Sequence, residues 1–132
     1  MSLRKQVVVS PQMPPALGPY SHAVRAGDLI FLAGQPGVDP DSGKVIGTDF
    51  HSQAEQAFKN ISRVLRASGS SMDQVVKTTV FLADPTQFAV LNQLYAKYFP
   101  TDPPVRSTPI VQLPQGLLIS IECIAVSNEK AA

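Results

Sequence analysis

Residues 117–126 read Leu-Leu-Ile-Ser-Ile-Glu-Cys-Ile-Ala-Val, and this stretch decides what kind of fold the chain can form. Successive side chains of a β-strand point to opposite faces of the sheet. The two sides of this strand would be Ile119, Ile121, Cys123, Ala125 and Leu118, Ser120, Glu122, Ile124. Strands that are apolar on both sides are typical of sheets covered on both faces. We therefore predict a strand that is buried on both faces and has one charged side chain, that of Glu122.

Five other segments have the apolar, β-branched character of strands. They are residues 6–9, 22–26, 29–34, 74–82 and 106–113. Gly27-Asp28 predicts the turn of a hairpin, and Pro114-Gln115-Gly116 separates the last two strands of the chain. If those two strands pair around Gln115, position 106 lies opposite about 124. Arg106 and Glu122 would then share one end of the sheet.

Two segments have the period of an amphipathic helix. The first begins at Thr48 or Asp49, either of which can cap it, and ends at Gly69. The second runs over residues 86–98, before Pro100. Their apolar stripes are Phe50, Ala54, Ala57, Ile61, Val64, Leu65 and Phe88, Leu91, Leu94, Tyr95, Tyr98.

The predicted order is β-β-β-α-β-α-β-β, an α/β (α+β) fold in a single domain over residues 1–132. Two helices can cover only one face of a sheet of about six strands. Several strands, such as residues 29–32, are apolar on both sides, so the other face needs a partner. Charged residues make up 16% of the chain, against roughly 25% in most soluble domains. Interface cores are depleted of charge, so both observations predict an oligomer.

Composition excludes several classes of protein. The net charge of +1 gives no field for a polyanion, which argues against a nucleic-acid or membrane-surface binder. No apolar run is long enough to span a membrane, and the segment after Met1-Ser2-Leu3 is too short for a signal peptide. Cys123 is the only cysteine, so there is no disulfide framework. These features predict a cytoplasmic protein.

The chemical candidates are few. No nucleotide-binding motif is present, and His22 and His51 lack a carboxylate or cysteine at ligand spacing, so neither a cofactor nor a metal is predicted. Partial burial of Glu122 would raise its pKa toward the range useful for proton transfer. Arg106 and Glu122 could form either a structural ion pair or a ligand clamp. Tyr20 and Cys123, taken singly, indicate packing rather than chemistry.

Many blocks along the chain together resemble one known family. They are Gly18-Pro19-Tyr20-Ser21, Leu32-Ala33-Gly34-Gln35, Val38-Asp39-Pro40 with Gly43, residues 76–82, Phe88-Ala89-Val90-Leu91-Asn92, Pro104-Val105-Arg106-Ser107, Leu113-Pro114 and residues 119–126. The family is that of the reactive intermediate deaminases (Rid, or YjgF-like, proteins), once labelled translation inhibitors or endoribonucleases. The resemblance covers nearly the whole chain, in the same order and with similar spacing.

The resemblance implies a chorismate-mutase-like fold that assembles as a homotrimer, with a central barrel, outer helices and three clefts between subunits. It also implies cofactor-free hydrolysis of 2-aminoacrylate-type enamines and 2-imino acids to 2-keto acids and ammonia. By matching motifs, Arg106 would grip the substrate carboxylate with its planar guanidinium, and Glu122 would orient water and move protons. Substrate-binding positions would be Tyr20, Gly34, Asn92, Arg106 and Thr108.

The chain departs from the family pattern at two places. Many active members have a cysteine where this chain has Thr108, followed here by Pro109, which cannot donate to a strand ladder. The strand after Arg106 should therefore be irregular or lie at an edge. The usual Ile-Glu-Ile-Glu run reads Ile119-Ser120-Ile121-Glu122, which leaves one carboxylate.

Two rival functions stay open at this point. An endoribonuclease, which the older family labels imply, needs a basic groove with stacking aromatics, yet the chain has no Trp and only three Tyr and six Phe. A non-catalytic regulatory trimer would bind a small carboxylate in its cleft without converting it. Binding without turnover would distinguish the second from an enzyme.

Overall fold

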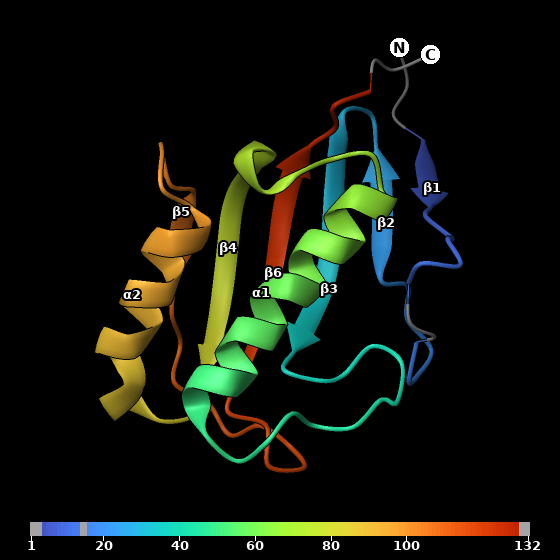
Figure 1. Cartoon of the computed structure of the whole chain (residues 1–132). Coiled ribbons are helices and arrows are strands. Elements are labelled where there is room, and N and C mark those ends of the chain that lie inside the picture. Colours follow the sequence, from blue (N-terminus) through green and yellow to red (C-terminus); the bar gives the residue numbers. More distant parts are fainter. Residues whose placement is uncertain (1–3, 14–15, 130–132) are drawn as a thin grey trace.

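Strand β6 (Ile119–Val126) lies inside a mixed six-stranded sheet in the computed structural model, which describes residues 4–13 and 16–129 (Figure 1). The other strands are β1 (Lys5–Val7), β2 (Ala23–Ala26), β3 (Leu29–Pro36), β4 (Val75–Leu82) and β5 (Val105–Ser107). Their order across the sheet is β1-β2-β3-β6-β4-β5. All neighbours are antiparallel except β4 and β5, which are parallel. The central position of β6 follows from its apolar sequence.

Burial along β6 alternates as its sequence predicts. Ile119, Ile121, Cys123 and Ala125 are buried, and the residues between them are half-buried or exposed. The buried side faces the helices. The strand that residues 117–126 predict is therefore confirmed, with two residues fewer at its start.

The β2–β3 hairpin is also confirmed. Its register pairs Ala26 with Leu29 and Ala23 with Leu32. Gly27 has φ +61° in the turn, a left-handed conformation that glycine adopts without steric cost.

Two helices form the second layer. Helix α1 (Phe50–Ala67) is capped by Asp49, whose side chain accepts a hydrogen bond from the Ser52 N–H at 2.9 Å. Helix α2 (Phe88–Tyr98) follows the 3₁₀ turn η2 (Pro85–Gln87), and a second such turn, η1 (Met72–Gln74), precedes β4. The predicted stripe of α1 is buried over its whole length; on α2, Phe88 stays 43% exposed.

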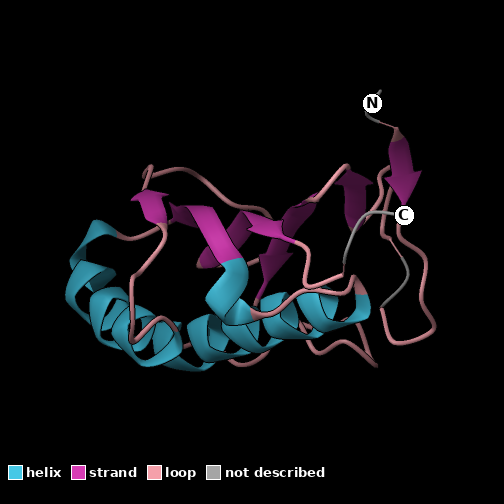
Figure 2. Ribbon diagram, turned by 90° about the horizontal axis from the view of Figure 1, so that it is seen from above, coloured by secondary structure: helices cyan, strands magenta, loops and turns pink. Residues whose placement is uncertain are grey.

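Both helices pack on the same face of the sheet (Figure 2). The core lies between the layers, where Phe58, Ile61, Leu65, Val80 and Ile121 are almost fully buried. On the opposite face, Leu29 and Phe31 are each 40% exposed. The α+β architecture with two helices on one face is thus confirmed, and we call the other side the open face.

The predicted hairpin between residues 106–113 and 117–126 is wrong. β5 has only three residues and pairs with β4 at the edge of the sheet, whereas β6 lies between β3 and β4. Pro109 breaks the strand, as its missing N–H requires, and its carbonyl accepts from the Leu82 N–H at 3.0 Å. The edge position expected for the strand after Arg106 is confirmed.

A buried glutamine of α1 holds the loops at one end of the sheet. The Gln53 amide donates to the carbonyls of Gly47 and Gly116 at 3.3 and 3.1 Å, and its oxygen accepts from the Leu118 N–H at 2.8 Å. Gly37 packs so closely that an added Cβ would lie 2.4 Å from the Gln53 carbonyl oxygen. These contacts fix the return of the chain into β6.

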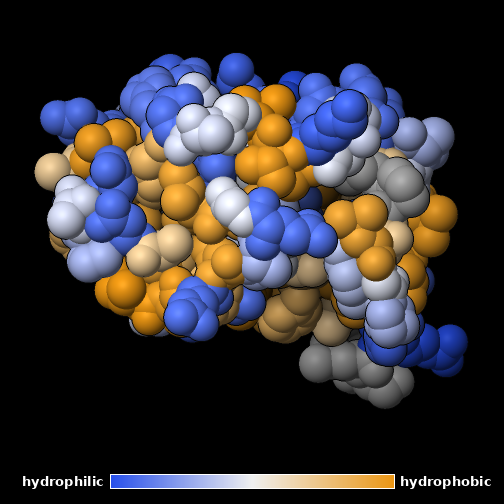
Figure 3. All heavy atoms as spheres, turned by 90° about the horizontal axis from the view of Figure 1, so that it is seen from below, coloured by the Kyte–Doolittle hydropathy of each residue, from blue (hydrophilic) through white to orange (hydrophobic). Residues whose placement is uncertain are grey.

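The same end of the molecule, seen from below, has apolar and polar side chains side by side (Figure 3). Leu17, Phe88 and Ile110 are exposed large apolar residues. Pro14, Pro15 and Met1-Ser2-Leu3 lie outside the described residues. Within residues 4–13 and 16–129, no helix has the length and apolar character needed to cross a membrane.

Candidate functional site

Arg106 projects from the edge strand β5 onto helix α2. One terminal N–H₂ group donates to Asn92 Oδ1 at 2.9 Å. The guanidinium carbon lies 4.7 Å from the centre of the Tyr95 ring and 5.4 Å from that of Phe88. Cation–π attraction acts within about 6 Å of a ring centre. The guanidinium is therefore positioned by one hydrogen bond and two rings.

The three α2 residues that hold Arg106 occupy one stripe of the helix. Positions 88, 92 and 95 are four and three residues apart, which places them on one face. Tyr95 is buried, and its hydroxyl lies 2.7 Å from Thr78 Oγ1 in β4. Burial raises the pKa of Tyr95, although the Thr78 bond and the Arg106 charge oppose the shift. The ring under Arg106 is thus a neutral phenol fixed to the sheet.

Glu122 lies on the other side of the sheet from Arg106. Register pairs Arg106 with Thr78, and Thr78 with Cys123, which is buried toward the helices. Glu122 is next to Cys123 in β6, so its side chain points to the opposite side of the sheet, the open face, where it is exposed. The prediction that Arg106 and Glu122 of one chain could form an ion pair is therefore wrong. It depended on a hairpin that does not form, and the two side chains lie on opposite sides of the sheet. The expected partial burial of Glu122 is also absent in the single chain.

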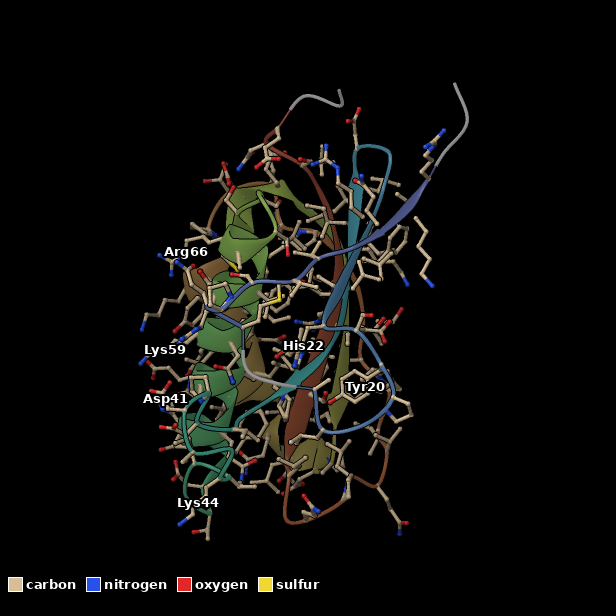
Figure 4. All side chains as sticks on the ribbon, turned by 90° about the vertical axis from the view of Figure 1, so that its right-hand side faces the viewer. Tyr20, His22, Asp41, Lys44, Lys59 and Arg66 are labelled. Carbon is tan, nitrogen blue, oxygen red and sulfur yellow. The ribbon has the colours of Figure 1, made fainter. Side chains whose placement is uncertain are left out.

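Tyr20 and Gly34 lie at a third location. Tyr20, 48% exposed, is on the open side of the sheet (Figure 4), with its ring centre 5.8 Å from that of His22. Gly34 sits where the β3–β6 register shifts between Leu32 and Gln35. A Cβ on Gly34 would lie 2.7 Å from Ser120 Oγ, so glycine permits this close approach. The Gly34 backbone is exposed as a result.

Thr108 follows β5 directly and is half-buried. The structure therefore brings together Arg106 and Asn92 among the six predicted site residues, and Thr108 lies two residues after Arg106 in the sequence. Tyr20 and Glu122 share the open side. No single chain gathers all six.

Sequence reasoning missed a polar pair beside Tyr20, formed by the half-buried His22 and the buried Gln35. Gln35 is 2% exposed, and its amide donates to His22 Nδ1 at 3.1 Å and to the Ala33 carbonyl at 3.3 Å. The other ring nitrogen of His22, Nε2, is buried without a partner among the described residues. Sequence reasoning also missed that Phe88 and Tyr95 contact Arg106, although their spacing from Asn92 along one helix was visible in the sequence.

The remaining candidates support no metal or thiol chemistry. Burial, with a smaller effect of Glu122, raises the pKa of Cys123 to about 12, so the expected inert core cysteine is confirmed. His51 does have a carboxylate at i+4: its Nδ1 lies 3.7 Å from Glu55, so the expectation that it lacks one was wrong. The described residues contain no group of three or more His, Cys, Asp or Glu side chains that could hold a metal.

The arrangement around Arg106 is suited to binding a carboxylate. A guanidinium has five N–H donors, and the contact with Asn92 uses one of its terminal nitrogens. The planar fork can offer two parallel N–H groups to one carboxylate. Because α2 already orders the side chain, little rotamer freedom is lost on binding.

Comparison with known proteins places these observations in a family. Residues 10–127 match the family described as endoribonuclease L-PSP. The human 2-iminobutanoate/2-iminopropanoate deaminase is 40% identical over 128 residues, covering 96% of this chain and 93% of the human protein. The chloroplastic reactive intermediate deaminase A of Arabidopsis thaliana is 46% identical over 125 residues, covering 94% of this chain and 67% of the plant protein.

Solved structures agree with the fold. The crystal structure of E. coli TdcF with bound serine superposes with a TM-score of 0.86 at 32% identity, covering 93% of this chain and 99% of TdcF. The backbone similarity therefore extends over the sheet and both helices.

Proposed function

Because this chain belongs to the endoribonuclease L-PSP family, which includes the reactive intermediate deaminases, we propose that it hydrolyses reactive 2-imino acids and their enamine tautomers to 2-keto acids and ammonia. Relatives named as deaminases, at 40–46% identity, support a Rid-family deaminase.

The observation that carries the proposal is the ordered guanidinium of Arg106. A 2-imino acid has a carboxylate next to the reacting carbon, so holding that carboxylate fixes the carbon as well. Tyr95 and Asn92 hold Arg106 in one orientation. Positioning of this kind contributes several kcal/mol to lowering a barrier, up to about 7–11 kcal/mol in well-oriented systems.

The chemistry needs one water molecule and proton transfers. The water oxygen attacks the imine carbon and gives a tetrahedral carbinolamine. One proton of the water moves to the imine nitrogen as the carbinolamine forms. The remaining hydroxyl proton then moves to the amine nitrogen, the C–N bond breaks with release of ammonia, and the carbon becomes a keto group. Glu122 would orient the water and carry the protons, which contributes roughly 10²–10⁴-fold in rate.

Separation of Arg106 and Glu122 on two sides of the sheet supports a site formed between subunits. We propose a homotrimer in which the open face packs inside and each cleft combines Arg106, Asn92 and Thr108 of one subunit with open-side groups of a neighbour. Exposed Leu29 and Phe31 on that face support the arrangement, since apolar side chains gain by leaving water. Tyr20 and the Gly34 backbone would line the cleft.

The test couples an amino-acid oxidase to the purified protein and follows the loss of the imine. We expect faster conversion to the keto acid and ammonia than in buffer, and loss of that acceleration in Arg106→Ala. Arg4→Ala removes the same charge at an exposed position and should be as active as the wild type. No acceleration by the wild-type protein would contradict the proposal, as would an Arg106→Ala variant of full activity.

Two alternatives have their own outcomes. If calorimetry with 2-ketobutyrate detects binding but the assay detects no turnover, the protein is a carboxylate-binding module. If single-stranded RNA is cleaved and its binding weakens steeply with salt, the endoribonuclease label describes its activity. A cytoplasmic location stays a prediction from the sequence.

A further inference from the structure

A groove on the outer side of α1 is lined by three cations that the proposed deaminase reaction does not use. It has a volume of about 510 Å³, within the range of roughly 300–1,000 Å³ for small-molecule sites. Its lining residues are Gln12, Pro40, Gln56, Lys59, Asn60, Arg63 and Arg66. Figure 4 shows Lys59 and Arg66 pointing away from the sheet. We call this surface the α1 groove.

The cations of the α1 groove lie on one helical face and form no ion pair with any other described residue. Residues 59, 63 and 66 are separated by four and three positions, so their side chains are neighbours. The ion pairs of the described residues involve other cations, and Glu55, the one acid of α1, faces Lys97 at 3.5 Å and His51 at 3.7 Å. Like charges at these spacings repel each other. An anion bound among them would remove that repulsion.

Arg63 is held in place by a hydrogen bond, and two amides that line the groove, those of Asn60 and Gln56, are held by hydrogen bonds within the protein. Arg63 Nε donates to the Gln12 carbonyl at 2.6 Å, and its terminal N–H₂ groups make no hydrogen bond within residues 4–13 and 16–129. Asn60 is 7% exposed and donates to the carbonyls of Pro36 and Val38 at 3.0 and 2.8 Å. Gln56 donates to Asn60 Oδ1 at 2.9 Å. These amides are therefore committed to the protein.

An acid that interacts with Arg63, Asp39, is also committed. Asp39 Oδ1 accepts from the N–H groups of Asp41 and Ser42, each at 2.8 Å. These bonds, with a smaller effect of Arg63, lower the pKa of Asp39. This half-buried residue caps a turn in the β3–α1 connection, and its one negative charge offsets only part of the positive charge.

The size and chemistry of the groove indicate the class of ligand. Residues 59–66 rise about 10 Å along the helix at 1.5 Å per residue, a spread suited to several linked anionic groups. Guanidinium forks fit phosphate oxygens in pairs. The described lining has no aromatic ring on which a nucleobase could stack. We propose that the α1 groove binds a small multivalent phosphate, recognised through its phosphate groups alone.

The test is calorimetric titration of the full-length protein with inorganic tripolyphosphate in 150 mM NaCl. We expect saturable binding at one site per chain. The double variant Lys59→Gln/Arg66→Gln should weaken it at least about tenfold, since hydrogen bonds to charged groups are worth enough for such a change. Lys5→Gln, an exposed lysine on β1, should alter it less than about twofold.

Separate readouts distinguish this proposal from the deaminase. Lys59 and Arg66 are exposed and lie outside the proposed reaction site, so the double variant should melt no lower than the wild type and keep its deaminase activity. Absence of saturable binding, equal weakening by Lys5→Gln, or citrate binding as tight as tripolyphosphate would each overturn the proposal. Those results would leave the deaminase assay unaffected.

Discussion

At the scale of single residues, the geometry of Arg106 is more specific than its charge. Its guanidinium lies against the Tyr95 and Phe88 rings and bonds to Asn92. A lysine ammonium has the same charge but neither the flat surface nor the paired donors. The site should therefore distinguish arginine from lysine.

We predict that Arg106→Lys lowers kcat/KM for a 2-imino acid by roughly 10–100-fold, the loss expected from one or two charge-assisted hydrogen bonds. KM should rise because the carboxylate is bound less tightly, and kcat should fall because a less firmly held carboxylate leaves the imine carbon less well positioned. Steady-state kinetics with the oxidase-coupled assay measures both constants. A lysine variant with wild-type KM would show that Arg106 does not bind the carboxylate.

Cys123 gives a prediction about pH. Burial raises the pKa of its thiol from 9.0 to about 12, so the folded protein holds the proton more tightly than the unfolded chain. The contribution to stability is present below pH 9 and is lost as pH rises from 9 toward 12. A disulfide reagent at pH 8 should leave the native thiol unmodified and react fully in denaturant; rapid labelling of the native protein would contradict this.

At the scale of elements, α1 positions the loops that lead into β6. Gln53 is fully buried and makes hydrogen bonds to Gly47, Gly116 and Leu118. Those bonds set where the chain turns back into the sheet, beside the Gly34–Ser120 contact. The shape of this end of the sheet therefore depends on one helix side chain.

We predict that Gln53→Leu lowers the free energy of unfolding by about 2–4 kcal/mol, because two carbonyls and one N–H lose their buried partner. Gln93→Leu makes the same exchange at an exposed position of α2 and should change stability by less than about 0.5 kcal/mol. Urea denaturation followed by circular dichroism measures both. Equal stability of the two variants would refute this role of Gln53.

At the scale of the whole molecule, the open face is the part of the fold that lacks a covering layer. The helices occupy the other face (Figure 2), and Phe31 pairs in register with Val24 and Ile124 across three strands. This apolar row is continuous, so a second copy of the same sheet is a suitable partner. A site shared between subunits would also bring Arg106 and Glu122 together.

We predict that light scattering after gel filtration gives three times the chain mass of 14.2 kDa. Phe31→Glu should dissociate the assembly, because buried carboxylates would face each other, and deaminase activity should fall with it. An unchanged circular dichroism spectrum would show that the subunit still folds. A wild-type monomer of full activity would contradict the shared site.

Local pattern in the sequence determined most of the elements. Alternation in residues 117–126 and the stripe from Phe50 to Leu65 were enough to predict β6 and α1, since each depends on which side chains face the core. The Asp49 cap and the Gly27 turn are local as well. The Rid resemblance rests on motifs that are contiguous in the chain.

Only the tertiary structure decided which strands are neighbours and which side chains meet. The two final strands of the chain are adjacent in sequence, yet β6 lies between β3 and β4, and Arg106 and Glu122 lie on opposite sides of the sheet. Strand order depends on packing between residues far apart in sequence, which no local period encodes. The contacts of Arg106 with two aromatic rings, and the α1 groove with its three cations, likewise exist only in the folded chain.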